Sequence, residues 1–91
     1  MTFNGFLYCV YSKDNKINKY FREFINSLNS LKKVLPSSNV TLYTNVNFDN
    51  KYKIDHIIFD KDIPKEHIAK AKALLNSPYE KTIFLDTDTL I

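Results

Sequence analysis

The chain has 91 residues, of which 44% are hydrophobic and 25% are charged, and its formal net charge is +3. This composition is typical of one globular domain at most, and no apolar run approaches the roughly 18 residues of a membrane-spanning helix. A single cysteine, Cys9, excludes an internal disulfide, and a single glycine, Gly5, excludes a phosphate-binding P-loop and a dinucleotide-binding fingerprint.

The first half of the chain reads as strand, helix and strand. The apolar, aromatic run over residues 6–11 predicts a buried strand. Apolar residues then recur at steps of three and four, which predicts an amphipathic helix that stops before Pro36. The β-rich run 40–44 predicts a second strand. The helical stripe that we expect to be buried comprises Ile17, Tyr20, Phe21, Phe24, Ile25, Leu28, Leu31 and Leu35.

The second half predicts strand, helix and strand. Residues 45–53 are polar and fall short of the dozen or so residues of a helical crossover, so we expect an irregular link before a third strand at 54–59. Pro64 fits the first turn of a second helix, with Asp62 as its cap. A fourth strand follows at 82–85. The apolar face expected for the second helix comprises Ile68, Ala71, Leu74 and Leu75.

The order β-α-β-β-α-β predicts an α/β fold with a partial Rossmann-like, mostly parallel sheet. Right-handed crossovers favour the strand order 3-2-1-4, in which the two helices cover opposite faces. One helix per face is thin cover for four strands. We therefore expect residues 1–91 to form a single, incomplete domain that relies on a further C-terminal half or on a partner chain.

Two carboxylates, Asp86 and Asp88, follow the fourth predicted strand with one residue between them. They point the same way if the strand continues through them, because strand side chains alternate between faces. Together they could share a hard divalent cation at the carboxyl end of a strand, where ligands bind in open α/β sheets. The alternative is structural, since Asp and Thr are common turn formers and Asp-Thr-Asp could simply be a turn.

The segment 77–89, Ser-Pro-Tyr-Glu-Lys-Thr-Ile-Phe-Leu-Asp-Thr-Asp-Thr, resembles the buried strand and DxD motif of GT-A-type glycosyltransferases. The resemblance covers nearly the whole chain, as the N-terminal, nucleotide-binding half of that family, and its specificity rests on the DxD. It implies binding of a nucleoside-diphosphate sugar, such as a UDP- or GDP-sugar. It also implies Mn²⁺ or Mg²⁺ as the ion between diphosphate and carboxylates, and transfer of the sugar to an unidentified acceptor.

The resemblance further implies roles for single residues. Asp88 would be the direct metal ligand, and Asp86 would bind the metal, the ribose or both. Lys70 lies where related sequences carry a basic residue that can hold a phosphate, although it could equally belong to a solvated helix face. Tyr11 and Ser12 match the place where the family holds the nucleobase, and strand-end packing is their alternative reading.

Family members continue well beyond the DxD, and that later half supplies the acceptor site and any catalytic base. We therefore expect donor binding but not completed transfer from this chain alone, and the catalytic residues are unknown. The alternative function is a non-catalytic binding or interaction module. Nucleic acid is not expected as a partner, because the helical aromatics fall on the predicted buried stripe. The N-terminus lacks a signal-peptide pattern, so we expect a cytoplasmic protein.

Overall fold

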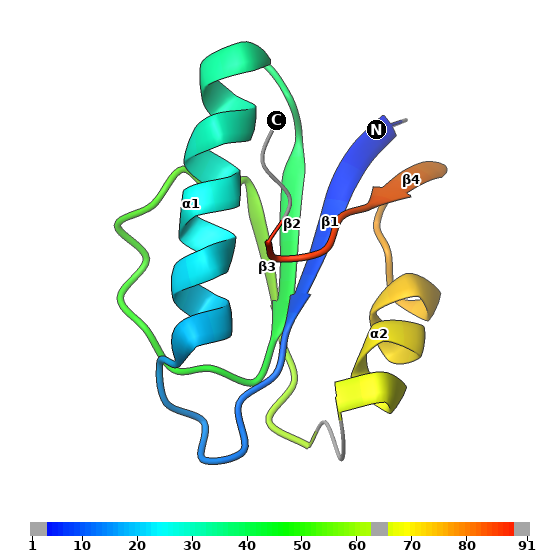
Figure 1. The fold of residues 1–91 in the computed structure, drawn as a ribbon. Helices are drawn as coiled ribbons and strands as arrows, with labels where there is room; N and C mark the ends of the chain where they lie inside the picture. Colours follow the sequence, from blue (N-terminus) through cyan, green and yellow to red (C-terminus); the bar gives the residue numbers. More distant parts are fainter. Residues whose placement is uncertain (1–3, 63–65, 89–91) are drawn as a thin grey trace.

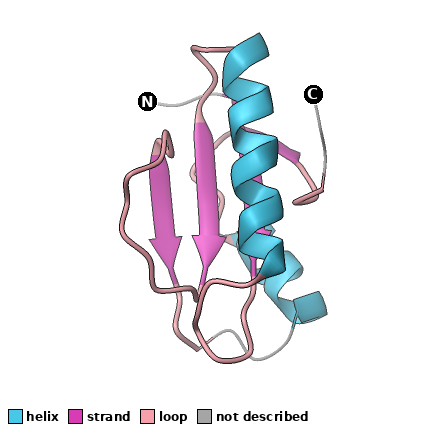
Figure 2. Cartoon of the chain, turned by 60° about the vertical axis from the view of Figure 1, so that its left-hand side comes forward, coloured by secondary structure: helices cyan, strands magenta, loops and turns pink. Residues whose placement is uncertain are grey.

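The computed structural model of the chain describes residues 4–62 and 66–88, and for residues 66–68 only the backbone (Figures 1 and 2). The predicted order of strands and helices is confirmed. No helix in the described part of the chain combines the length and apolar character needed to cross a membrane. The elements are β1 (Asn4–Val10), α1 (Lys19–Val34), β2 (Val40–Thr44), β3 (His56–Phe59), α2 (Glu66–Leu75) and β4 (Lys81–Phe84).

The four strands form one sheet in the order β3-β2-β1-β4, and all three pairings are parallel. The predicted α/β fold and strand order 3-2-1-4 are therefore confirmed. Residues 45–55 join β2 to β3 without a helix or strand, so the irregular link is confirmed as well. The central strand β1 pairs along its whole length with one neighbour or the other, which places it in the middle of the core.

The two helices cover opposite faces of this sheet, as Figure 1 shows. Tyr8 and Val10 of β1 pack on the α1 face, where Phe24 and Leu28 meet them. The alternate β1 residues, Leu7 and Cys9, pack on the α2 face. Both faces of β1 are thus apolar, and this explains why its sequence is a continuous apolar run and not an alternating one.

Helix α1 begins and ends where its sequence provides suitable capping groups. The side chain of Asn18 accepts a hydrogen bond from the backbone N–H of Phe21 at 3.0 Å and is the N-cap. Pro36 follows the helix and cannot continue it. The residues of α1 that are buried are Phe21, Phe24, Ser27, Leu28 and Leu31.

The predicted buried stripe of α1 is wrong at both ends. Ile17, Tyr20 and Leu35 are 47%, 38% and 46% exposed. Ile17 and Leu35 lie just outside the helix, before Lys19 and after Val34, and Tyr20 lies in its first turn. The buried residues of α1 run only from Phe21 to Leu31, so the helix packs on the sheet through its middle turns and not through its ends.

Helix α2 packs through small residues and not through the predicted leucines. Ala69 and Ala73 are fully buried, and their spacing of four places them on one helical face close to the sheet. Leu74 and Leu75 are 50% and 86% exposed, so the predicted face, which includes the exposed Ala71, is wrong. Residues 63–65, where Pro64 was expected to start the helix after Asp62, and the side chain of Ile68 lie outside the described residues.

A polar network fastens α2 to the sheet. The Tyr43 hydroxyl donates to Asp60 Oδ2 at 2.5 Å, and Lys72 Nζ lies 2.7 Å from the same oxygen. Hydrogen bonding by Lys72, and then by Tyr43, lowers the pKa of Asp60 to about 2. Burial and the nearby Asp60 carboxylate raise the pKa of Tyr43. The network ties β2, the end of β3 and α2 together.

We expect Asp60→Asn to lower the free energy of unfolding by about 1–2 kcal/mol at neutral pH. The folded-state pKa of Asp60 is depressed, so its stabilisation is present above the unfolded value of about 3.9 and is lost as pH falls toward 2. Urea denaturation at neutral pH and at acidic pH should therefore show that the difference in free energy of unfolding between the native protein and the variant is smaller in acid. Asp49→Asn, in an exposed loop position, is the control. An equal deficit at both pH values would contradict this account.

Candidate functional site

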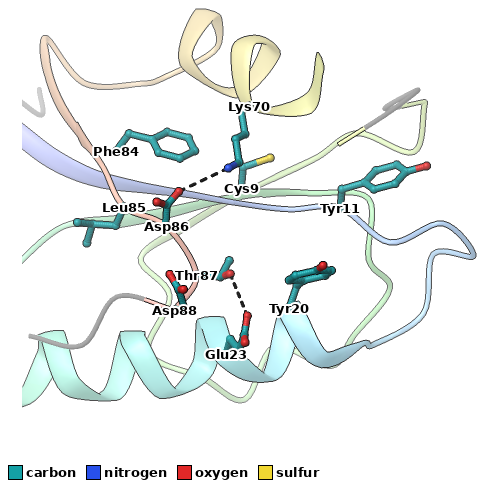
Figure 3. A pocket seen from close by; sticks show the side chains of 10 residues that line it. All are labelled: Cys9, Tyr11, Tyr20, Glu23, Lys70, Phe84, Leu85, Asp86, Thr87 and Asp88. Atoms are coloured by element: carbon teal, nitrogen blue, oxygen red, sulfur yellow. Dashed lines mark hydrogen bonds and ion pairs between the residues drawn. The ribbon is translucent and has the colours of Figure 1, made fainter. Parts of the chain in front are cut away.

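A pocket of about 270 Å³ lies at the carboxyl ends of β1 and β4 (Figure 3). Each element around it contributes to the lining, so the pocket belongs to the fold and not to one loop. The end of β1 provides Cys9 and Tyr11, α1 provides Tyr20 and Glu23, α2 provides Lys70, and the chain from Phe84 to Asp88 completes the lining.

The topology places the pocket at a switch point of the sheet. From β1 the chain proceeds through α1 to β2 on one side, whereas α2 leads to β4 on the other side of β1. Neighbouring crossovers that run to opposite sides leave a crevice at the carboxyl ends of the strands, where ligands of open α/β sheets bind. The backbone N–H of Leu85 donates to the carbonyl of Leu7 at 3.0 Å, and pairing with β1 ends there. Residues 86–88 then line the space that opens.

The strand does not continue through the two aspartates. Strand β4 ends at Phe84, and Thr87 and Asp88 form a turn, so the condition under which strand alternation would align Asp86 and Asp88 is not met. The reason is the end of backbone pairing after Leu85. Both aspartates nevertheless line the pocket, and both are exposed to solvent.

The segment 86–88 is contacted by a side chain of α2 and by a side chain of α1. Lys70 Nζ lies 3.5 Å from Asp86 Oδ1, with the two side chains 51% and 67% exposed. The Thr87 hydroxyl donates to Glu23 Oε1 at 3.4 Å. Figure 3 shows both contacts, with Lys70 descending from α2 and Glu23 rising from α1. Among the described residues Asp88 makes no hydrogen bond or ion pair, so its carboxylate is available to a ligand.

The charges that line the pocket favour a cation. Three carboxylates, those of Glu23, Asp86 and Asp88, face one ammonium group, that of Lys70. Like charges that share a site raise its negative potential and attract counter-ions. A bare diphosphate would meet net repulsion here, and a divalent cation bound to it would lessen that repulsion.

The carboxylates of the pocket limit the kind of metal site that could form here. Within residues 4–62 and 66–88, no three His, Cys, Asp or Glu side chains come close enough together to hold a metal ion. A cage made by the protein alone is therefore not formed by these residues. Mg²⁺-like ions in phosphate sites, however, take one or two carboxylates and complete their shell with phosphate oxygens and water. Asp86 and Asp88, two exposed carboxylates that line one pocket, are the side chains that would hold such an ion.

The structure brings together four of the five predicted site residues. Tyr11, Lys70, Asp86 and Asp88 all line the pocket, whereas Ser12 does not. Ser12 is 2% exposed, its backbone N–H donates to Asn45 Oδ1 at 2.8 Å, and Asn45 Nδ2 donates back to the Ser12 carbonyl at 2.7 Å. Its place in the fold is thus to fasten the end of β1 to the end of β2.

Two pocket residues on α1 were missed by the sequence interpretation. Tyr20 was assigned to the buried stripe, and Glu23 was given no role. The two residues are three apart on a helix and therefore share a face. The sequence carries no direct signal for this, because it is the fold that places the first turn of α1 beside the carboxyl end of β1.

Comparison of the chain with protein-family models, with curated proteins and with solved structures finds no match. The chemical capacity of the pocket therefore follows from its own residues. Carboxylates hold cations, an ammonium group holds a phosphate as a point charge, and the rings of Tyr11 and Tyr20 offer flat surfaces for a base or a sugar.

Proposed function

We propose that this pocket binds a nucleoside-diphosphate sugar through a divalent cation held by Asp86 and Asp88, in the manner of a glycosyltransferase. The observation that carries the proposal is the position of two exposed carboxylates in a switch-point pocket that also contains a lysine. Mn²⁺ or Mg²⁺ held there by Asp86 and Asp88 would act as a Lewis acid for the charge that develops on a leaving diphosphate. Sugar transfer to an acceptor is the activity that such binding would serve.

In this proposal Lys70 changes partner when the ligand binds. Its ion pair with Asp86 is long, at 3.5 Å, and both side chains are at least half exposed, so the pair contributes little to stability. A cation that binds Asp86 would displace the ammonium group, which can then turn toward a phosphate oxygen. Tyr11, which follows β1, and Tyr20 of α1 would hold the flat parts of the ligand.

A non-catalytic module is the second candidate function. The observation in its favour is that Thr87 and Asp88 form a turn and that the contact of Thr87 with Glu23 fastens this turn to α1. In that case the acidic residues shape the chain after β4 and no nucleotide binds.

Calorimetric titration separates the two candidates. We expect UDP or GDP to bind in the presence of Mn²⁺, and chelation of the metal to weaken that binding by at least about tenfold, or 1.4 kcal/mol. The matched control is the nucleoside without its diphosphate, uridine or guanosine. Its affinity should be independent of the metal, because the cation is proposed to contact the diphosphate alone.

Two results would refute the transferase proposal. One is nucleotide binding with equal affinity in Mn²⁺ and in chelator. The other is no binding of either diphosphate at millimolar concentrations, together with a thermal unfolding midpoint that falls when Asp88 is changed to Asn. The second result is the one expected of a structural turn.

A further inference from the structure

A basic surface lies at the other end of the sheet from the pocket. It surrounds the C-terminal turns of α1 and the link before β3, toward the amino ends of the strands. Lys32 is paired with Asp55 at 2.7 Å, whereas Lys33, Lys51 and Lys53 have no acidic partner among the described residues. We call this the lysine surface, and it consists of Lys32, Lys33, Lys51 and Lys53.

Exposed apolar residues adjoin the lysine surface. Val34 and Leu35, which follow Lys33 directly, are 55% and 46% exposed. Leu35 also borders an open groove of about 470 Å³ that is lined by Phe6, Pro36 and the 54% exposed Ile83, among others. The Lys32 ammonium donates to the carbonyl of Ser38, and Ser38 lines the same groove. Cationic and apolar side chains thus meet at one end of the molecule.

We infer that this end of the protein docks on an anionic lipid surface. Lysines near such a surface are attracted to the headgroup phosphates, and apolar side chains beside them enter the boundary between headgroups and acyl chains. Val34 and Leu35 would enter the lipid while Lys33, Lys51 and Lys53 contact phosphates. This inference is independent of the nucleotide proposal, because the two surfaces share no residue.

A single-stranded nucleic acid fits the lysine surface less well. Such ligands need aromatic rings on which bases stack. Tyr52, the aromatic residue between Lys51 and Lys53, is partly buried, and its ring centroid lies 5.9 Å from that of Phe21 and 6.3 Å from that of Phe48. Lys51 Nζ lies 5.9 Å from the centre of the same ring. The Tyr52 ring is therefore engaged, and the adjoining apolar groove would have no partner on a polyanion.

Co-sedimentation with vesicles tests the inference. The protein should bind phosphatidylcholine vesicles that contain phosphatidylglycerol, bind pure phosphatidylcholine weakly, and be released by salt. Lys33→Gln/Lys51→Gln/Lys53→Gln should lower the partition coefficient roughly 100-fold, at about fivefold per lysine. The control Lys13→Gln/Lys16→Gln/Lys61→Gln removes the same charge from loops at the carboxyl ends of the strands and should change it less than about fivefold. Val34→Ser/Leu35→Ser should weaken binding without altering its dependence on salt.

Three results would overturn lipid docking. The first is no sedimentation of the native protein with the anionic vesicles. The second is an equal loss in both triple variants, which would reflect net charge and not this surface. The third is tighter binding of a single-stranded RNA oligonucleotide than of vesicles, abolished by the triple substitution on the lysine surface, which would identify a nucleic-acid site. Thermal unfolding of each variant shows that it is folded before binding is measured.

Discussion

Gly5→Ala is expected to lower the free energy of unfolding by about 3 kcal/mol, the upper part of the usual range for overpacking. A β-carbon at position 5 would lie 2.2–2.3 Å from three atoms of the Tyr79 ring, which covers the glycine. The ring has little room to retreat, since Tyr79 is 9% exposed and its hydroxyl accepts a hydrogen bond from Thr41 Oγ1 at 2.7 Å. For a chain of this size the thermal unfolding midpoint should fall by roughly 12–24 °C.

A double-mutant cycle isolates the cause of this loss. In a Tyr79→Leu background the flat ring is gone, and Gly5→Ala should then lower stability by less than about 1 kcal/mol. The same loss in both backgrounds would show that something other than the ring opposes the β-carbon. The contact also bears on the site, because Tyr79 lies just before β4 and its packing on β1 sets where β4, and hence Asp86, approaches the pocket.

Much of the fold follows from local chemistry in the sequence. The apolar run of β1, the cap at Asn18 and the stop at Pro36 are each set by a few neighbouring residues. The strand order follows from the handedness of crossovers. The predictions that were wrong, those of the buried faces of the two helices, depend on contacts with residues that are distant in sequence. Nothing in the local sequence shows that Ala73, and not Leu74, meets the sheet. A small side chain is favoured at that position only because the helix lies close to the sheet.

Some residues of the candidate site could likewise be predicted from the sequence, and others could not. Asp86 and Asp88 stand out in the sequence because only Thr87 separates them directly after an apolar run. Tyr20 and Glu23 join them only because α1 starts beside the carboxyl end of β1, a fact of three-dimensional arrangement. The end of β4 could not be foreseen either, since it depends on where pairing with β1 stops.

The double variant Asp86→Asn/Asp88→Asn is expected to weaken Mn²⁺-dependent binding of UDP or GDP by at least about 100-fold, roughly 3 kcal/mol. Asparagine keeps the size of each side chain and an oxygen, but it removes the charge that is proposed to hold the cation. The free energy of unfolding should not fall in this variant. Asp88 has no ion pair or hydrogen bond with the described residues, and the exposed pair between Asp86 and Lys70 contributes little.

Loss of binding without loss of stability is what distinguishes residues kept for a ligand from residues kept for the fold. Removal of two of the three carboxylates that line the pocket also lowers its negative charge, so the thermal unfolding midpoint should stay level or rise. Asp49→Asn/Glu80→Gln, which removes the same charge from exposed positions outside the pocket, should leave nucleotide binding unchanged. A marked fall in the midpoint of the Asp86/Asp88 variant, with nucleotide affinity intact, would instead assign Asp-Thr-Asp to the architecture of the turn after β4.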